Sequence, residues 1–258
     1  MNKKRLFELG ICQGRLIKSP GNQLQWFPGD LWEEEFKRAG RIGYSFIELL
    51  AERKHNPKNP IWSDQGRGKI IENNRNYNLN IYSACFDYVI DNSIFYKNSL
   101  DQKVISYSKK FINVCHDLGI KIIIIPLLEK SDLNYQNNNL AYNYLKLISD
   151  YAYEYDIKLS IESIASPNLI IETIKNLKKF EVGCVYDTGN RALLSENVCD
   201  EIQALSEYIN HIHLKDRDIK NNNIVIGTGI VDFIKIFEKL AEINYNGKFS
   251  FESNRGRN

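Results

Sequence analysis

The sequence predicts a single-domain (β/α)8 barrel that spans residues 1–258, and three observations indicate it. A length of 258 residues suits one large α/β barrel. Short apolar segments alternate with longer amphipathic ones along the chain, at intervals of about 25–40 residues, the size of one βα unit. No Pro-, Ser- or Gly-rich linker divides the chain. Eight such strands in an undivided chain favour a closed barrel over an open sheet.

The strands of the barrel are expected where short apolar runs are bounded by polar or turn-forming residues. In chain order these runs are Phe7–Cys12, Phe46–Leu49, Asn80–Cys85, Lys121–Ile125, Lys158–Glu162, Val182–Asp187, His211–Lys215 and Lys248–Glu252.

Amphipathic segments between these runs are expected to form the outer helices. They are Leu31–Arg41, Gly68–Tyr77, Leu100–Leu118, Leu140–Tyr155, Asn168–Leu177, Cys199–Ile209 and Val231–Ile243. Gly119 should end the third helix in a left-handed cap, and Ser166 followed by Pro167 should begin the fifth. Few residues follow Glu252, so the eighth outer helix is expected to be missing. Either that wall is open, or a second subunit covers it in a homodimer.

The composition excludes several classes of function. Lys and Arg number 34 against 32 Asp and Glu, a formal charge of +2, which gives no support for a nucleic-acid binder. Five widely spaced cysteines without a CxxC pair indicate reduced thiols and a cytoplasmic protein. The N-terminus makes a poor signal peptide, and the most apolar stretch, Ile122–Leu128, is too short to cross a membrane.

Ionisable side chains close four consecutive strands of the predicted barrel. Side chains alternate between the two faces of a strand, so Leu159 and Ile161 should face the helices while Glu162 faces the barrel axis. The same alternation turns three further residues inward, Asp187, His213 and Glu252. The carboxyl ends of barrel strands are where active sites form. The four residues are therefore expected to meet at one site.

The chemistry of these four side chains predicts a divalent metal ion. Three carboxylates brought together repel one another, and a divalent cation removes that repulsion. One histidine with three carboxylates suits Mn²⁺, Mg²⁺, Co²⁺ or Zn²⁺ better than a thiol-rich structural site does. His211 shares a face with His213 but lies one layer deeper, so His213 is the preferred ligand. A single strand-end carboxylate often only anchors a loop, and the prediction therefore depends on the order of all four.

At this point the sequence resembles the xylose isomerase-like barrels. This sugar phosphate isomerase/epimerase group also includes tagatose and psicose 3-epimerases, inosose-processing enzymes and endonuclease IV. The matching motifs span nearly the whole chain in the order of the family, and the most specific is His211–Arg217 followed by Ile226–Asp232. The others are Gly10–Leu16, Ser160–Glu162, Tyr186–Asn190 and Phe251–Ser253.

The resemblance implies roles for individual residues. One divalent metal ion would be held by four residues, Glu162, Asp187, His213 and Glu252. Glu162 and Glu252 would also remove and return a proton, and Lys215 and Arg217 would approach the substrate. Many 3-epimerases have a histidine where this chain has Asn190, which can hydrogen-bond a hydroxyl but carries no charge. That departure weakens the transfer of 3-epimerase activity as such.

Other polar residues near strand ends are candidate substrate contacts. Gln13 and Arg15 follow the first strand, where an arginine could clamp a hydroxyl or a phosphate. Glu48 is expected to close the second strand and Asn190 follows the sixth. These four, with Lys215 and Arg217, form the predicted substrate-binding set.

The function predicted from the site is isomerisation or epimerisation of a sugar or sugar phosphate. A metal bound beside a carbonyl would stabilise the enediolate that forms on deprotonation. A dehydratase acting on an inosose-like ketone would use the same site and is the main alternative. An endonuclease IV-like phosphodiesterase would need several zinc ions and more histidines than the 4 in this chain. A sugar-binding barrel without catalysis is the remaining alternative.

Overall fold

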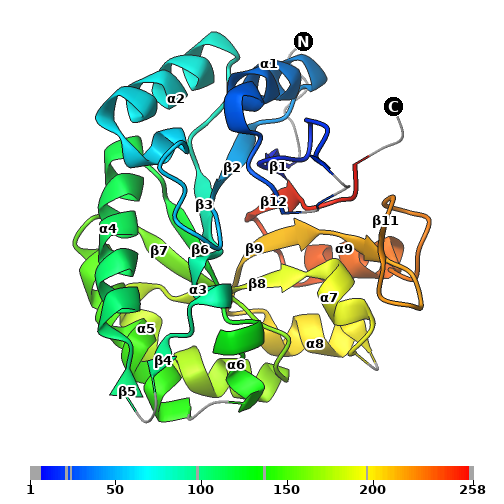
Figure 1. Cartoon of the computed structure of the whole chain (residues 1–258). Coiled ribbons are helices and arrows are strands. Elements are labelled where there is room, and N and C mark those ends of the chain that lie inside the picture. The colour runs from blue at the N-terminus through cyan, green and yellow to red at the C-terminus, as the bar shows by residue number, and fades with distance from the viewer. Residues whose placement is uncertain are drawn as a thin grey trace.

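The computed structural model describes residues 7–255 except 21, 22, 24, 97, 98, 136, 137 and 196. Parallel strands close into a barrel in the order β1-β12-β9-β8-β7-β6-β3-β2 (Figure 1). They are β1 (Leu9–Cys12), β2 (Phe46–Ala51), β3 (Ser83–Phe86), β6 (Ile122–Pro126), β7 (Lys158–Glu162), β8 (Gly183–Asp187), β9 (Ile209–Leu214) and β12 (Lys248–Phe251). The predicted (β/α)8 barrel is confirmed.

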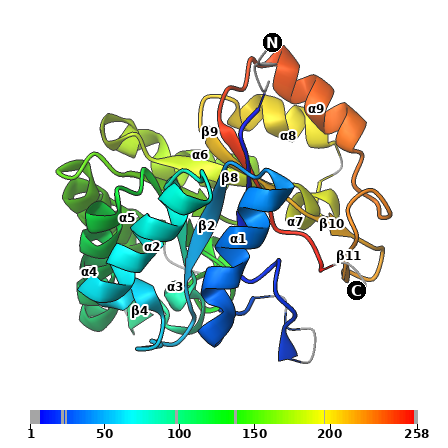
Figure 2. The ribbon, with the colours of Figure 1, turned by 90° about the horizontal axis from the view of Figure 1, so that it is seen from above.

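The outer layer consists of helices that follow the strands one by one. They are α1 (Trp32–Ile42), α2 (Asp64–Asn76), α4 (Gln102–Leu118), α5 (Asn138–Tyr153), α6 (Pro167–Ile174), α8 (Val198–Leu205) and α9 (Phe233–Glu242). Each packs against the next, and Figure 2 shows α8 and α9 side by side. Gly119 ends α4 with a φ of 77°, and the Ser166 side chain caps α6, as predicted.

Short elements lie between the main ones and were not predicted, because they span too few residues to show a hydrophobic period. They are α3 (Tyr88–Asp91), α7 (Thr188–Ala192), the hairpin of β4 (Phe95–Tyr96) with β5 (Ser99–Leu100) and the hairpin of β10 (Asp216–Arg217) with β11 (Asn223–Ile224). The 3₁₀ helices are Gly29–Leu31, Pro60–Trp62, Glu129–Ser131, Leu133–Tyr135 and Lys175–Phe180.

Several predicted boundaries differ from the observed ones by a few residues, and two of these differences change how a residue is placed. The helix expected to reach Ile209 ends at Leu205, because Ile209 already pairs with Cys184 in the barrel. The second strand does not end at Leu49 but continues to Ala51, because these residues pair with β3. Glu48 therefore lies in the middle of β2 rather than at its end.

The barrel interior is apolar on one side and polar on the other. Leu159 and Ile161 join the large apolar layer between strands and helices, as the alternation predicted. Inward-facing apolar residues form a separate small cluster, Leu50, Cys85, Ile122, Ile124 and Val185. Buried polar side chains lie on the other side of the interior, Glu48 of β2, His211 and His213 of β9 and Ser250 of β12, and they belong to the site described below.

No helix follows β12 in the part of the chain that the structure describes. A groove lies beside β12 and α9, lined by Phe7, Phe237, Leu240, Tyr245 and Phe249. Phe7 and Phe237 are 48% and 40% exposed. The homodimer expected to cover this wall stays a prediction that light scattering of the protein in solution can test.

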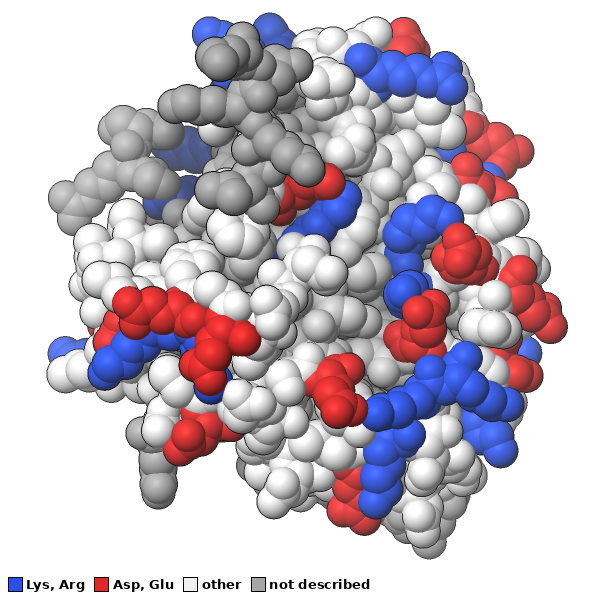
Figure 3. All heavy atoms as spheres, turned by 180° about the vertical axis from the view of Figure 1, so that it is seen from behind, with Lys and Arg blue, Asp and Glu red and all other residues white. Residues whose placement is uncertain are grey.

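Charges of both signs are distributed over the surface. On the face shown in Figure 3, Lys and Arg side chains lie among Asp and Glu side chains rather than in one basic field. Among the described residues, none of the helices has the length and apolar character that a membrane crossing requires.

Candidate metal centre and substrate pocket

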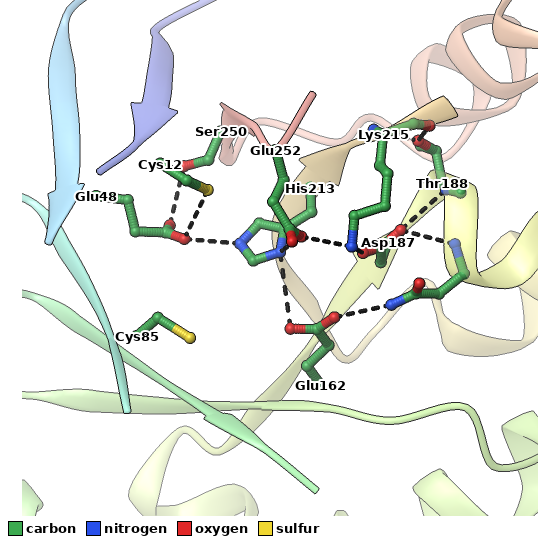
Figure 4. A network of polar contacts seen from close by, with 12 residues as sticks. Cys12, Glu48, Cys85, Glu162, Asp187, Thr188, His213, Lys215, Ser250 and Glu252 are labelled. Atoms are coloured by element: carbon green, nitrogen blue, oxygen red, sulfur yellow. Dashed lines mark hydrogen bonds and ion pairs between the residues drawn. The ribbon is translucent and has the colours of Figure 1, made fainter. Parts of the chain in front are cut away.

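The four predicted metal ligands come together at the carboxyl end of the barrel. Glu162 ends β7, Asp187 ends β8, His213 lies on β9, and Glu252 directly follows β12. One ligand atom from each lies within 4.8 Å of those of the others. All four side chains are buried, none of them more than 6% exposed. Figure 4 shows Glu162, Asp187 and Glu252 around the ring of His213.

The ring of His213 is held in one orientation by Glu48. Its Nε2 atom lies 2.8 Å from Glu48 Oε1, and an ionised carboxylate can only accept, so Nε2 carries the proton. The other ring nitrogen, Nδ1, makes no hydrogen bond, although it lies 3.2 Å from Glu252 Oε2 and 3.7 Å from Glu162 Oε2. A proton on Nδ1 would face these two carboxylates, and a metal ion would bind the nitrogen in place of that proton. A metal-bound histidine commonly has this arrangement, with its second nitrogen donating to a carboxylate.

Glu48 is the centre of a buried hydrogen-bond network. Its Oε2 atom accepts from Ser83 Oγ and Ser250 Oγ, both at 2.9 Å, and lies 2.9 Å from His211 Nε2. Cys12 Sγ contacts Oε1 at 3.3 Å. Burial opposes ionisation, but His213 and His211 hold the pKa of Glu48 well below its usual range. Figure 4 shows Glu48 on the far side of the His213 ring from Glu162.

This placement corrects the expected role of Glu48. The residue was predicted to touch the substrate from a strand end, but it lies in mid-strand, is 2% exposed and does not line the pocket. Its contacts instead fix the tautomer and direction of His213. His211, which also contacts Glu48, remains outside the group of four candidate ligands.

The charge balance around the four candidate ligands is compatible with a bound divalent cation. Four carboxylates, those of Glu48, Glu162, Asp187 and Glu252, face two permanent cations, Arg15 and Lys215, and the titratable ring of His213. Burial opposes a charge on His213, but Glu48, Glu252 and Glu162 hold its pKa well above the usual value. Burial, together with the charges of Glu252 and Asp187, raises the pKa of Glu162 to about 8. Protons on His213 and Glu162 therefore balance the carboxylates in the absence of a metal, and one divalent ion would take their place. The residues present therefore fit the metal that the donor set implies.

We expect Glu48→Gln to weaken the binding of a divalent metal about 10- to 100-fold, the usual effect of losing a hydrogen-bonding partner of a metal ligand. An amide presents either a donor or an acceptor to His213 and no longer favours one tautomer. Calorimetry with Mn²⁺ or Zn²⁺ measures the affinity, and Ser83→Ala, which removes one of the bonds to Oε2, is the matched control. Equal affinities for wild type and Glu48→Gln would contradict the role given to Glu48.

Lys215 is buried beside two of the candidate ligands. Its Nζ atom lies 2.8 Å from Asp187 Oδ2 and 2.8 Å from Glu252 Oε2. The stem of the side chain crosses Gly189, where an added Cβ would come within 2.8 Å of Lys215 Cγ. Thr188 Oγ1 is hydrogen-bonded to both the carbonyl and the amide of Lys215. Lys215 lines the pocket, so the predicted substrate contact stays a prediction, and its ammonium also compensates the charge of the carboxylates.

Asn190 and Arg217, both predicted to bind substrate, are linked to each other and to Glu162. Asn190 Nδ2 donates to Glu162 Oε1 at 3.0 Å, and Asn190 Oδ1 accepts from Arg217 Nη2. Arg217 also donates to Asn221, and its own partners in these contacts are neutral amides. Both residues line the pocket. The Asn190 amide leaves Glu162 Oε2 as the oxygen nearest His213 Nδ1.

The loop after Arg217 is organised by Asp216. Its Oδ2 atom accepts from the amides of Gly227 and Gly229, both at 2.9 Å, and its Oδ1 atom accepts from Val231 N at 3.2 Å. Gly229 is needed because a Cβ there would lie 2.3 Å from Arg217 O. These contacts explain why the two most specific motifs follow one another in the sequence: Asp216 of the first holds the glycines of the second.

Gln13 and Arg15 do not line the pocket, contrary to the predicted substrate contacts. Gln13 Oε1 accepts from Leu50 N at 3.0 Å, which ties the first loop to β2. Arg15 is 4% exposed, and its Nη2 atom lies 3.1 Å from Glu252 Oε1. Because Arg15 is directed inward at a carboxylate, it orients and charge-balances Glu252 rather than forming part of the pocket wall.

A pocket of about 360 Å³ opens above the four candidate ligands. Glu162 and Glu252 line it, whereas Asp187 and His213 lie behind its wall. Several other lining residues were not predicted, Gln25, Arg53, Asp87, Glu129 and Asn221. Asp87 could have been found, because it follows the inward-facing Cys85 by two residues, but the predicted third strand stopped at Cys85.

A closed (β/α)8 barrel with acidic residues and a histidine gathered at the carboxyl ends of its strands defines a class of barrels with a candidate metal centre. Residues 36–258 match the family model described as xylose isomerase-like TIM barrel, and the chain belongs to that family. The resemblance noted in the sequence is thereby confirmed.

Individual relatives are more distant. The chain is 25% identical over 240 residues to L-ribulose-5-phosphate 3-epimerase UlaE of Salmonella typhi, which covers 87% of this chain and 82% of that protein. An uncharacterized protein of Methanocaldococcus jannaschii is 29% identical over 133 residues, and the match spans 46% of this chain and less than half, 45%, of that protein. A solved structure titled as the IOLI protein with a binding zinc atom superposes with a TM-score of 0.72 at 19% identity, covering 96% and 90% of the two chains.

Proposed function

We propose that this protein is a metal-dependent isomerase or epimerase of a sugar or sugar phosphate, with Glu162, Asp187, His213 and Glu252 as the metal ligands. The observation that carries the proposal is that only two of the four candidate ligands line the pocket. Glu162 and Glu252 line the pocket, where they can reach a substrate, whereas Asp187 and His213 lie behind its wall. The name of the relative in Salmonella typhi, a 3-epimerase of a ketose phosphate, and the zinc named for the IOLI protein support the same reaction class.

The reaction is proton transfer at a carbon next to a carbonyl group. A divalent cation held by the four ligands would polarise the carbonyl and stabilise the negative charge left by deprotonation. One of the two glutamates removes the proton, and the other returns one from the other side of the substrate. β7 and β12, which carry them, are separated in the barrel by β8 and β9, so the two carboxylates approach the pocket from different directions. Asn190 and Arg15 hold these carboxylates in place.

The other contents of the site agree with a small polar substrate. A volume of about 360 Å³ is at the lower end of the range for ligand pockets, about 300–1,000 Å³.

The two histidines outside the barrel interior do not add to the metal ligands: His55 contacts Tyr107 and His116 packs on Tyr155. A second group of possible ligands among the described residues, Cys12, Glu48 and His213, shares His213 with the cluster of four, so the two groups are not independent metal positions. This arrangement favours a single metal ion over the several zinc ions expected of an endonuclease IV-like enzyme.

Deuterium incorporation from solvent is the test of this function. We expect wild-type protein supplied with Mn²⁺, Mg²⁺, Co²⁺ or Zn²⁺ to exchange the proton next to the carbonyl of at least one ketose or ketose phosphate in D₂O. Chelator-treated protein should lose the exchange, and addition of the metal should restore it. Mass spectrometry of the sugar detects the label whatever the final product.

The same spectra separate epimerisation from dehydration. An isomerised or epimerised product keeps the mass of the substrate apart from the deuterium, whereas the product of an inosose-type dehydratase is lighter by one water. Exchange that is unaffected by complete metal removal would contradict the metal-dependent reaction. Exchange with none of a panel of ketoses and their phosphates would contradict the proposed reaction class.

A further inference from the structure

Asp87 is a buried carboxylate in the pocket wall that belongs neither to the ligand cluster nor to its supporting network. It follows β3 directly, and its amide donates to Ala51 O at 3.0 Å, which fixes the backbone to the end of β2. The side chain is 2% exposed and lines the pocket together with Glu162, Glu252 and Lys215. Its position is therefore fixed and accessible only from the pocket.

The side chain of Asp87 lacks the partners that a buried carboxylate requires. Oδ1 accepts from Cys85 Sγ at 3.1 Å, a weak donor, and Oδ2 has no hydrogen-bond partner within the described protein. Asp87 precedes α3, yet it makes none of the capping bonds that usually explain an aspartate in this position. Burial raises the pKa of Asp87 to about 6. Such a group destabilises the fold unless something else satisfies it.

Arg53, a cation that lines the same pocket, does not hydrogen-bond Asp87 either. Arg53 Nη1 donates to Asp91 Oδ1 at 3.2 Å, and its two terminal nitrogens lie 3.0 Å and 2.7 Å from the carboxylate of Glu129. These bonds engage the guanidinium with Asp91 and Glu129, so Arg53 acts on Asp87 through its charge alone. The unpaired oxygen is thus available to a group that enters the pocket.

The order of the strands places Asp87 across the pocket from Arg217. In the closed barrel, β3 and β9 are separated by three strands on either side, so the residues that follow them face one another. Asp87 follows β3, and Arg217 follows β9. The pocket therefore has an acidic wall opposite a basic one, with Glu162 and Glu252 between them in the lining.

We propose that Asp87 is a substrate-binding residue whose free oxygen accepts a hydrogen bond from a hydroxyl group of the sugar. The inference rests on the proposed function, because it takes the ligand to be a sugar, and it specifies the group on this side of the ligand. A phosphate at Asp87 would place two anions side by side in a buried site, which is unfavourable, and the guanidinium of Arg53 is already bonded to Asp91 and Glu129. An uncharged hydroxyl of a ketose therefore faces Asp87, and a phosphate, in a substrate that carries one, lies elsewhere in the pocket.

The test is a comparison of Asp87→Ala and Asp87→Asn with wild type, using metal-loaded protein. The probes are D-fructose, D-ribulose and their terminal phosphates, followed by deuterium incorporation, and kcat/KM is measured for the probe that wild type exchanges fastest. We expect Asp87→Ala to lower kcat/KM about 10- to 100-fold, the effect of losing a hydrogen bond to a charged group. Asp87→Asn keeps one acceptor oxygen and should lose less. Asp91→Asn is the matched control, because Asp91 ends the same short helix and does not line the pocket.

Thermal unfolding separates binding from a structural role. An unsatisfied buried carboxylate does not stabilise the fold, so Asp87→Asn should unfold at the wild-type temperature or above it. Unchanged or increased kcat/KM in both Asp87 variants would overturn the inference, as would a loss of activity that simply accompanies a loss of stability. If wild type exchanges none of the four probes, the proposed function fails for them and the inference fails with it. Exchange by wild type together with insensitive Asp87 variants overturns the inference alone.

Discussion

Replacing Glu252 by Gln should abolish deuterium incorporation into the substrate, with an expected rate loss of about 10²–10⁴-fold, the contribution of a positioned acid or base. Glu162→Gln should have an effect of the same size. Both carboxylates line the pocket, and an amide of the same shape cannot accept the proton. The measurement is the exchange rate in D₂O at a metal concentration that saturates each variant, because either substitution also changes a candidate ligand.

Two further measurements make this result specific. Calorimetry gives the metal affinity of each variant, so that a loss of exchange at full metal occupancy is assigned to proton transfer. Glu207→Gln is the control, because that carboxylate lies on the surface in an ion pair with Lys178. Wild-type exchange in metal-saturated Glu252→Gln would contradict the two-base reaction and leave Glu252 only as a ligand.

The fold and the four candidate ligands could be predicted because both follow from local patterns. Strand alternation is a property of a few consecutive residues, and it places Leu159 and Ile161 outward whenever Glu162 points inward. The carboxyl ends of the barrel strands then lie at the same end of the barrel, whatever the conformation of the loops. The choice of His213 over His211 rested on their relative depth on one strand and on the family resemblance.

The supporting residues could not be predicted because their contacts depend on the register between distant strands. Glu48 and His213 are 165 positions apart, and Arg15 and Glu252 are 237 apart. A register error of one residue would turn Glu48 out of the barrel. The predicted second strand was too short, so Glu48 was placed at the rim with the substrate instead of beneath the ring of His213.

The structure gives a physical role to Asn190, the residue at which the sequence departs from many 3-epimerases. In the sequence it was a neutral side chain at a position where many 3-epimerases have a histidine. In the barrel the Asn190 side chain accepts a hydrogen bond from Arg217 and donates one to Glu162. It therefore links the guanidinium to the candidate base and orients Glu162 without adding charge. A histidine could make these two contacts as well, but protonation would add a positive charge beside Glu162.

Lys215→Met should destabilise the metal-free protein by about 3–5 kcal/mol, the usual result of removing one partner from a buried ion pair. Lys215 Nζ lies 2.8 Å from both Asp187 Oδ2 and Glu252 Oε2, and the three side chains are buried. Without it, the carboxylates of the cluster lose one of the two cations that face them. Chemical denaturation of the chelator-treated protein measures the change in the free energy of unfolding.

Addition of a divalent metal should recover part of this loss, so the stabilisation by metal should be larger in Lys215→Met than in wild type. The reason is that the bound cation and the Lys215 ammonium act on the same carboxylates, and each is worth more when the other is absent. Lys158→Met is the control, since its exposed pair with Glu181 should contribute no more than about 1 kcal/mol. If metal stabilises both proteins equally, Lys215 and the metal do not share these carboxylates, and the placement of the metal among Glu162, Asp187, His213 and Glu252 would have to be abandoned.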